Sequence, residues 1–138
     1  MGNMETEKTI IDTDLLIDLL RKQKQATAFI TKLEEKNYIL ATTAVNIFEL
    51  HHGAHKSMES EKNLQAIRVL ISRLSILPFT SKAAQKAGHI YAQLERQGQP
   101  IGLRDTLIAA IALTKECSVA TRNQAHFSKI PDLKIITT

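Results

Sequence analysis

Residues 8–20 read KTIIDTDLLIDLL, a short apolar run that leads directly into a second apolar segment, with aspartates at the junction. Residues 8–13 predict a buried strand and residues 14–20 a brief helix. The same alternation continues along the chain, with further helices expected at residues 26–36, 43–55, 60–75, 83–94 and 103–113 and further strands at 38–42, 76–79, 118–121 and 133–137. Strands that alternate with helices predict an α/β sandwich around a mostly parallel sheet.

The composition is that of an ordinary globular domain. The 138 residues are 43% hydrophobic and 23% charged, which excludes the disordered, collagen-like and coiled-coil classes. A chain of this length buries one ordinary core. We therefore expect a single domain over residues 1–138, with residues 1–7 as a polar N-terminal extension.

The sequence gives no indication of a membrane span, an export signal or a disulfide framework. No apolar run approaches the ~18–20 residues of a transmembrane helix, and the first nine residues, MGNMETEKT, lack the hydrophobic stretch of a signal peptide. The one cysteine, Cys117, excludes an internal disulfide and a cysteine-based zinc site. A cytoplasmic location is therefore expected.

The charge balance permits a polyanionic partner without requiring one. The formal net charge is +4, from 18 Lys and Arg against 14 Asp and Glu, a value that many solvated surfaces share. Aromatic residues make up only 4% of the chain and Trp is absent. This scarcity argues against the base-stacking platform that many single-strand binders use.

Acidic and amide side chains fall where predicted strands end or where buried helices begin. Asp12 closes the first strand, and Asn123 follows the strand at residues 118–121. Functional sites of open parallel sheets gather at the carboxyl ends of the strands, so both side chains are expected at one edge. Glu49 and Asp105 have apolar neighbours in the sequence, where a carboxylate needs a partner to offset the cost of desolvation.

Each of these positions also has a purely structural interpretation. Asp14 and Asp105 are credible helix N-caps, and Glu49 taken alone is typical of an exposed helix residue. The spacing Thr121-x-x-Gln124 matches a capping box. The functional interpretation therefore rests on the combination of residues.

Four motifs, in this order, resemble those of PIN domains, and specifically of the VapC-type toxin ribonucleases of type II toxin–antitoxin pairs. They are IIDTDLLID at residues 10–18, NIFELHHGA at 46–54, RDTLIAA at 104–110 and ATRN at 120–123, the last followed by His126-Phe127, Ile130-Pro131 and Leu133-Lys134. The match extends over essentially the whole chain from residue 8 onward. The resemblance implies a three-layer α/β/α sandwich with a central parallel sheet.

The resemblance also implies an activity and its site. The activity is hydrolysis of RNA phosphodiester bonds with Mg²⁺ or Mn²⁺ as cofactor, and the implied catalytic and metal-binding residues are Asp12, Glu49 and Asp105. Few carboxylates and several retained waters are typical of protein-bound Mg²⁺. The implied partners are an RNA substrate, a cognate VapB-like antitoxin that covers the acidic groove, and a second copy of the chain in a homodimer.

Asn123 departs from the family pattern, which often has a fourth acidic residue at this position. An amide offers a neutral carbonyl oxygen and no negative charge, so we expect a single well-bound cation rather than two. Asp14 stands where Asn is commoner in the family and partly replaces the lost charge. Asp14, Thr121 and Asn123 are therefore expected as supporting residues.

Two other classes of function stay open. The Asp12-Thr13-Asp14 run also resembles the paired aspartates of haloacid-dehalogenase-like phosphatases, in which the first Asp is the nucleophile. Alternatively, the chain is a catalytically weak PIN-like module that binds RNA or protein. His51 and His55 have the i, i+4 spacing of a zinc pair, but no metalloprotease motif surrounds them, so we interpret them as solvated or RNA-facing.

Overall fold

The computed structural model describes residues 7–137, so the expected extension at residues 1–7 lies outside the described residues except for Glu7. Within them, five strands form one sheet in the order β3-β2-β1-β4-β5, and every pairing is parallel. The strands are β1 (Lys8–Ile11), β2 (Ile39–Thr43), β3 (Ser75–Leu77), β4 (Ser118–Thr121) and β5 (Ile135–Thr137).

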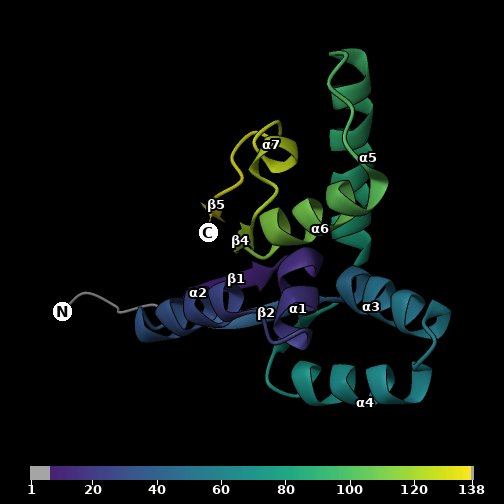
Figure 1. Ribbon diagram of the computed structural model, residues 1–138. Helices are drawn as coiled ribbons and strands as arrows, with labels where there is room; N and C mark the ends of the chain where they lie inside the picture. The colour runs from purple at the N-terminus through teal and green to yellow at the C-terminus, as the bar shows by residue number, and fades with distance from the viewer. Residues whose placement is uncertain (1–6, 138) are drawn as a thin grey trace.

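Helices cover both faces of this sheet, which confirms the expected α/β/α sandwich (Figure 1). One layer holds α1 (Thr13–Leu20), α2 (Lys24–Glu35) and α4 (Ser60–Ile71), and the other holds α5 (Ser81–Arg96), α6 (Leu103–Thr114) and α7 (Gln124–Phe127). The remaining helix, α3 (Ala44–Lys56), contributes side chains to both cores. None of the helices in residues 7–137 combines the length and the apolar character needed to cross a bilayer.

Two consecutive isoleucines in β1 divide the interior into two cores. Ile10 and Ile11 are both completely buried, and successive side chains of a strand point to opposite faces of the sheet. Ile10 joins the core formed with α5 and α6, whereas Ile11 joins the core formed with α1, α2 and α4. A strand buried on both faces is expected in a parallel sheet covered by helices on each side.

Helix α6 is buried nearly all round, as its sequence predicts. Five consecutive residues of this helix, Ile108, Ala109, Ala110, Ile111 and Ala112, have no exposed surface. The helix lies against both α5 and the sheet. Its N-terminus, where Asp105 is located, is thereby fixed close to the carboxyl ends of the strands.

The structure differs from the sequence prediction mainly at chain turns. Helix α4 ends at Ile71, and not near residue 75, because the N–H groups of Arg73 and Leu74 form tight turns to the carbonyls of Leu70 and Ile71. Helix α7 is not predicted at all. Its four residues are too few to show a helical period.

Candidate functional site

Asp12 lies at the carboxyl end of β1, as expected. Its backbone N–H donates to the carbonyl of Ala120 (2.9 Å), which continues the β1–β4 pairing by one residue. Its side chain accepts two hydrogen bonds, at Oδ1 from the N–H of Thr13 (2.8 Å) and at Oδ2 from Oγ1 of Thr121 (2.7 Å). Asp12 is therefore the residue at the N-cap of α1, and the alternative that Asp14 caps this helix is wrong.

Glu49 is held by residues from two other helices, α1 and α6. Its Oε1 accepts a hydrogen bond from Oγ1 of Thr13 (2.7 Å), and its Oε2 lies 3.3 Å from Nη1 of Arg104. Thr13 Oγ1 in turn accepts from the side-chain amide of Asn46 (2.8 Å), one turn before Glu49 on α3. Glu49 is thus a partly buried residue with fixed partners, and its interpretation as an ordinary exposed helix residue is wrong.

The buried Asn46 belongs to a capping box at the start of α3. Its Oδ1 accepts from the backbone N–H and from Oγ1 of Thr43, while its own backbone N–H donates to Thr43 Oγ1. Because the capping box fixes its side chain, Asn46 presents its amide to Thr13 in one orientation. Neither Asn46 nor Thr13 is assigned a role by the sequence, although Thr43-x-x-Asn46 directly after a strand is a signal of helix capping.

Asp105 projects from the first turn of α6 rather than capping it. The N-cap is Gly102, so the interpretation of Asp105 as an N-cap is wrong. Its Oδ2 lies 2.9 Å from Nδ1 of His126 on α7. His126 belongs to the fourth sequence motif, but the motif itself indicates no role for it.

Asn123 and Thr121 form the turn between β4 and α7. The backbone N–H of Asn123 donates to Oγ1 of Thr121 (2.8 Å), and no side-chain cap to α7 is formed, so the expected capping box with Gln124 is absent. The Asn123 amide instead lies 2.9 Å from Nδ1 of His126. The turn therefore connects Asp12, through Thr121, with the residues that contact Asp105.

The carboxylate of Asp12 is under electrostatic stress. The pKa of Asp12 is raised from 3.8 to about 6, mainly by burial and in part by the negative charges of Asp105 and Asp14, against the hydrogen bonds from Thr121 and Thr13 that lower it. A carboxylate destabilised by burial and by neighbouring negative charge is stabilised by a nearby cation. Of the three expected supporting residues, Thr121 and Asp14 act on the Asp12 carboxylate directly, whereas Asn123 bonds to Thr121. Their supporting roles stay predictions.

The donor set fits a hard divalent cation, although the carboxylates do not converge on one point. Over residues 7–137, no three Asp, Glu, His or Cys side chains are grouped closely enough to enclose a metal ion. Asp12, Glu49 and Asp105 each bond to a different partner. Oxygen donors in small number suit Mg²⁺ and Mn²⁺, which keep several waters, and the raised pKa of Asp12 supplies the electrostatic reason for a cation there.

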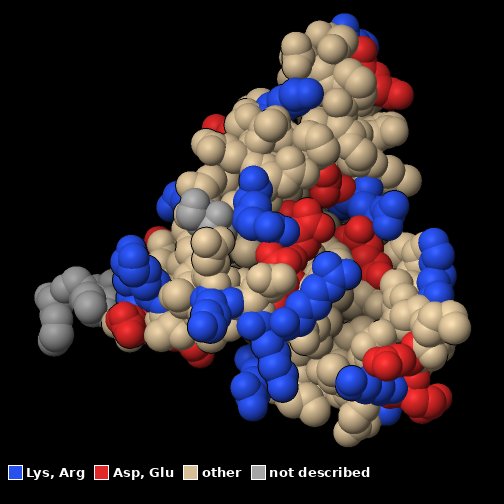
Figure 2. Space-filling model, viewed as in Figure 1, with Lys and Arg blue, Asp and Glu red and all other residues tan. Residues whose placement is uncertain are grey.

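Cationic side chains surround the region of Asp12, Glu49 and Asp105, which we call the acidic hollow. Figure 2 shows Asp and Glu atoms gathered at the centre of the face, in a depression, with Lys and Arg atoms around them. Two of the arginines are paired with carboxylates: Arg104 with Glu49 and Arg122 with Asp18, the latter at 3.0 Å. Both arginine side chains are about half exposed. Their free donors are therefore available to an anionic ligand that approaches the hollow.

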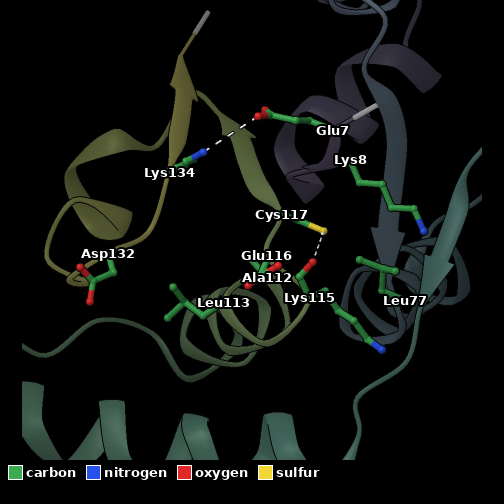
Figure 3. A pocket seen from close by; sticks show the side chains of 10 residues that line it. All are labelled: Glu7, Lys8, Leu77, Ala112, Leu113, Lys115, Glu116, Cys117, Asp132 and Lys134. Carbon is green, nitrogen blue, oxygen red and sulfur yellow. Dashed lines mark hydrogen bonds and ion pairs between the residues drawn. The ribbon is translucent and has the colours of Figure 1, made fainter. Parts of the chain in front are cut away.

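A second hollow lies around the amino ends of β1, β4 and β5, and its lining includes none of Asp12, Glu49 and Asp105 (Figure 3). Its volume is about 730 Å³, and its lining mixes opposite charges, among them Glu7, Lys8 and Lys134. Cys117 in its wall is buried, its Sγ lies 3.5 Å from the carbonyl of Lys115, and burial raises the pKa of the thiol. A buried thiol with a raised pKa is a poor nucleophile, in agreement with its interpretation as a small buried residue.

Comparison with known proteins agrees with this arrangement. The family model "PIN domain" matches residues 9–133. The chain is 30% identical to "Ribonuclease VapC2" of Rickettsia felis over 90% of this chain and 92% of that protein, and 36% identical to "tRNA(fMet)-specific endonuclease VapC" of Salmonella typhimurium over 70% and 73%. The crystal structure of VapBC2 from Rickettsia felis bound to a DNA fragment from their promoter superposes with a TM-score of 0.87, at 27% identity, and covers 95% of this chain and 98% of that one.

We expect the stability of the metal-free protein to depend on pH through Asp12. In the unfolded chain Asp12 ionises near its ordinary pKa of 3.8, but in the folded chain only near 6. Below pH 4 the raised pKa therefore has little effect on the free energy of unfolding. Above pH 6 the buried charge lowers this free energy by its full cost, about 3 kcal/mol at 1.4 kcal/mol per pKa unit. In urea unfolding with EDTA, the free energy of unfolding of Asp12→Asn should rise by about 2–3 kcal/mol relative to that of wild type as the pH is raised from 4 to 8.

The matched control for this measurement is Asp132→Asn, an exposed aspartate outside the acidic hollow. Its free energy of unfolding should follow that of wild type across the whole pH range. A difference between Asp12→Asn and wild type that does not change with pH would contradict the raised pKa.

Proposed function

The chain belongs to the PIN-domain family and, within it, to the VapC ribonucleases, and we propose that it hydrolyses RNA in the hollow around Asp12, Glu49 and Asp105 with a divalent cation as cofactor. The observation that carries the proposal is the buried Asp12 carboxylate, whose charge is opposed by burial and by Asp105. A buried anion in this position is costly unless a cation accompanies it during catalysis.

Asp12 and Asp105 would hold the cation, with Glu49 as a direct ligand or one that acts through water. A bound divalent cation supplies a Lewis acid that acidifies water and offsets negative charge on the reacting phosphate. Thr121 and the Thr13 N–H orient the two oxygens of Asp12. These bonds are made to the ionised carboxylate and keep it in the form that binds a cation.

Thr13 and Asn46 have a positioning role toward Glu49. The Thr13 hydroxyl oxygen accepts a hydrogen bond from the Asn46 amide, and its one hydrogen is donated to Glu49 at 2.7 Å. Since Asn46 is itself fixed by Thr43, the Glu49 carboxylate is held by a chain of bonds that starts on β2. Arg104 on its other oxygen would move to the RNA phosphate when the cation takes over Glu49.

The basic side chains around the hollow would bind the RNA backbone. Arg104 and Arg122 lie beside the acidic residues, and Arg21 lines the adjacent groove between α1, α3 and α4. Contacts of this kind position the phosphates without reading the base sequence. The substrate class is therefore RNA recognised by its shape, and the initiator tRNA is the first RNA to test because one relative carries that specificity in its name.

A VapB-like antitoxin is the expected protein partner, because solved structures similar to this chain are VapBC complexes. A groove of about 260 Å³ next to Glu49 is lined by apolar residues of α1, α3 and α4, including Ile17, Leu50 and Ile67. We propose that an amphipathic antitoxin segment docks there and directs an Arg or Lys toward the acidic residues. The apolar stripe formed by Leu64, Ile67 and Ile71 of α4, and by Leu74 just after this helix, packs in the core. Of these four residues only Ile67 lines the groove.

Location and assembly follow from the same proposal. A toxin whose substrate is cellular RNA acts in the cytoplasm, and the single free cysteine is compatible with a reducing compartment. The homodimer that the resemblance implies stays a prediction. Two rival functions are separable by experiment: a haloacid-dehalogenase-like phosphatase would release phosphate from small phosphoesters, and a catalytically weak binding module would bind RNA without cleaving it.

Removal of any one of the three carboxylates should abolish cleavage. Asp12→Ala, Glu49→Ala and Asp105→Ala are each expected to lower the rate of Mg²⁺- or Mn²⁺-dependent RNA cleavage by at least about 100-fold, since disturbance of residues around a metal already costs 10–100-fold. The measurement is single-turnover cleavage of tRNA, with circular dichroism to verify folding and Glu35→Ala, an exposed carboxylate on α2, as the matched control. Full activity in one variant would exclude that residue, and activity that survives EDTA would exclude the cation.

Asn123 should limit the affinity for the cation. Asn123→Asp adds a carboxylate beside Asp105 and is expected to tighten Mn²⁺ binding in a calorimetric titration, whereas Asn123→Ala should be milder than Asp12→Ala. The alternative is that Asn123 only caps α7. Its side chain makes no capping hydrogen bond in the structure, so neither variant removes a helix cap. Unchanged Mn²⁺ affinity in Asn123→Asp would remove Asn123 from the site.

Blocking the groove should weaken binding of the antitoxin and leave the fold intact. Gly53 is exposed on α3 and lines the groove, and a Cβ added there meets no atom within 4 Å. Gly53→Arg is therefore expected to weaken the complex with the VapB-like product of the neighbouring gene by at least about 10-fold, or 1.4 kcal/mol, with no loss of thermal stability. Gly88→Arg on α5, equally open, is the control. Equal affinity of both variants would place the antitoxin elsewhere.

A further inference from the structure

His126 is held at the edge of the acidic hollow by a buried anchor. The next residue, Phe127, is completely buried in the core beneath α6. His126 itself is about half exposed, with Nδ1 at 2.9 Å from Oδ2 of Asp105. The short helix α7 thus fixes an imidazole beside a carboxylate that the proposed function assigns to the cation.

The ring nitrogen Nδ1 of His126 has two polar neighbours and cannot form a hydrogen bond with both as they are oriented. Nδ1 of His126 lies 2.9 Å from Oδ2 of Asp105, which only accepts, and 2.9 Å from the side-chain Nδ2 of Asn123, which only donates. One ring nitrogen either donates or accepts, so it satisfies one of these neighbours and opposes the other. A cation bound by Asp105 and the lone pair of Nδ1 takes the place of the proton between these two atoms, and the Asn123 NH₂ then needs another acceptor.

The separation of the two atoms suits joint coordination. Neighbouring ligands of an octahedral ion at about 2.1 Å lie about 3.0 Å apart, and the Asp105 and His126 atoms are 2.9 Å apart. The same loop also reaches Asp12, because the N–H of Asn123 bonds to Thr121 and Thr121 bonds to Asp12. The loop that carries His126 is thereby linked to Asp12 as well as to Asp105.

We propose that His126 is a nitrogen ligand of the divalent cation, which gives the site a mixed oxygen and nitrogen donor set. The proposal rests on the proposed function and specifies its cofactor class. Imidazole binds first-row transition-metal ions, whereas Mg²⁺ prefers oxygen ligands alone. The site accordingly favours a transition-metal ion such as Mn²⁺ over Mg²⁺.

The other histidines require a control. His51 and His55 on α3 lie with ring centroids 6.4 Å apart, at the i, i+4 spacing that itself attracts metal ions. His55→Gln removes this pair and leaves the acidic hollow untouched, so it is the matched control for His126→Gln. A third variant, His126→Asp, replaces the imidazole nitrogen with carboxylate oxygens at the same position of the chain.

The test uses the purified full chain with Mn²⁺ or Mg²⁺ alone. Pulsed electron paramagnetic resonance of the Mn²⁺-loaded protein should show a ¹⁴N coupling in wild type and His55→Gln and none in His126→Gln. In calorimetric titrations, His126→Gln should bind Mn²⁺ about 10-fold more weakly than wild type does and Mg²⁺ less than about 2-fold more weakly. Both affinities are compared with those of wild type in the same buffer. His126→Asp should lose the coupling and shift the preference toward Mg²⁺.

Three outcomes would overturn the proposal. A wild-type protein that binds Mn²⁺ without ¹⁴N coupling has no nitrogen ligand, and the proposed ribonuclease function is unaffected. Equal losses of Mn²⁺ and Mg²⁺ affinity in His126→Gln would show that His126 only positions Asp105. A wild-type protein that binds neither cation overturns the metal-dependent function itself, together with this inference.

Discussion

The site depends on one hydrogen bond that joins the ends of two neighbouring strands. Thr121, the last residue of β4, donates to Asp12, the first residue after β1, at 2.7 Å. Because β1 and β4 are parallel, with Ile11 opposite Ala120, their next side chains emerge together at one edge of the sheet. The bond keeps a carboxylate buried at 5% exposure, and Thr121 also sets the turn that leads to α7.

Periodicity predicts the long elements of the fold because their apolar stripes are long. Helix α6 is recognisable as a fully buried helix from residues 103–113 alone, and the consecutive Ile10 and Ile11 identify a strand covered on both faces. Helix α7 escapes detection, since only Phe127 of its four residues is buried. Element ends also move by a few residues where backbone turns, which carry no apolar signal, close the helix.

The candidate site is predictable only in part, for a physical reason. Asp12 and Thr121 follow strands in a parallel sheet, so their proximity follows from topology. The partners of Glu49 and Asp105 do not, because Arg104 is 55 residues from Glu49 and His126 is 21 residues from Asp105. The first pair depends on how α3 meets α6 above the strand ends, and the second on how α7 lies against α6. No local pattern in the sequence encodes either contact.

Helix α6 has a consequence for the genetics of the protein. Its central alanines, Ala109, Ala110 and Ala112, have no exposed surface, so any larger side chain there overfills a core that is already closely packed. Cells that survive a selection against toxicity should therefore yield two kinds of allele. Substitutions at the acidic residues leave a soluble but inactive protein, whereas substitutions in α6 deplete the protein itself, and immunoblotting of the survivors separates the two kinds.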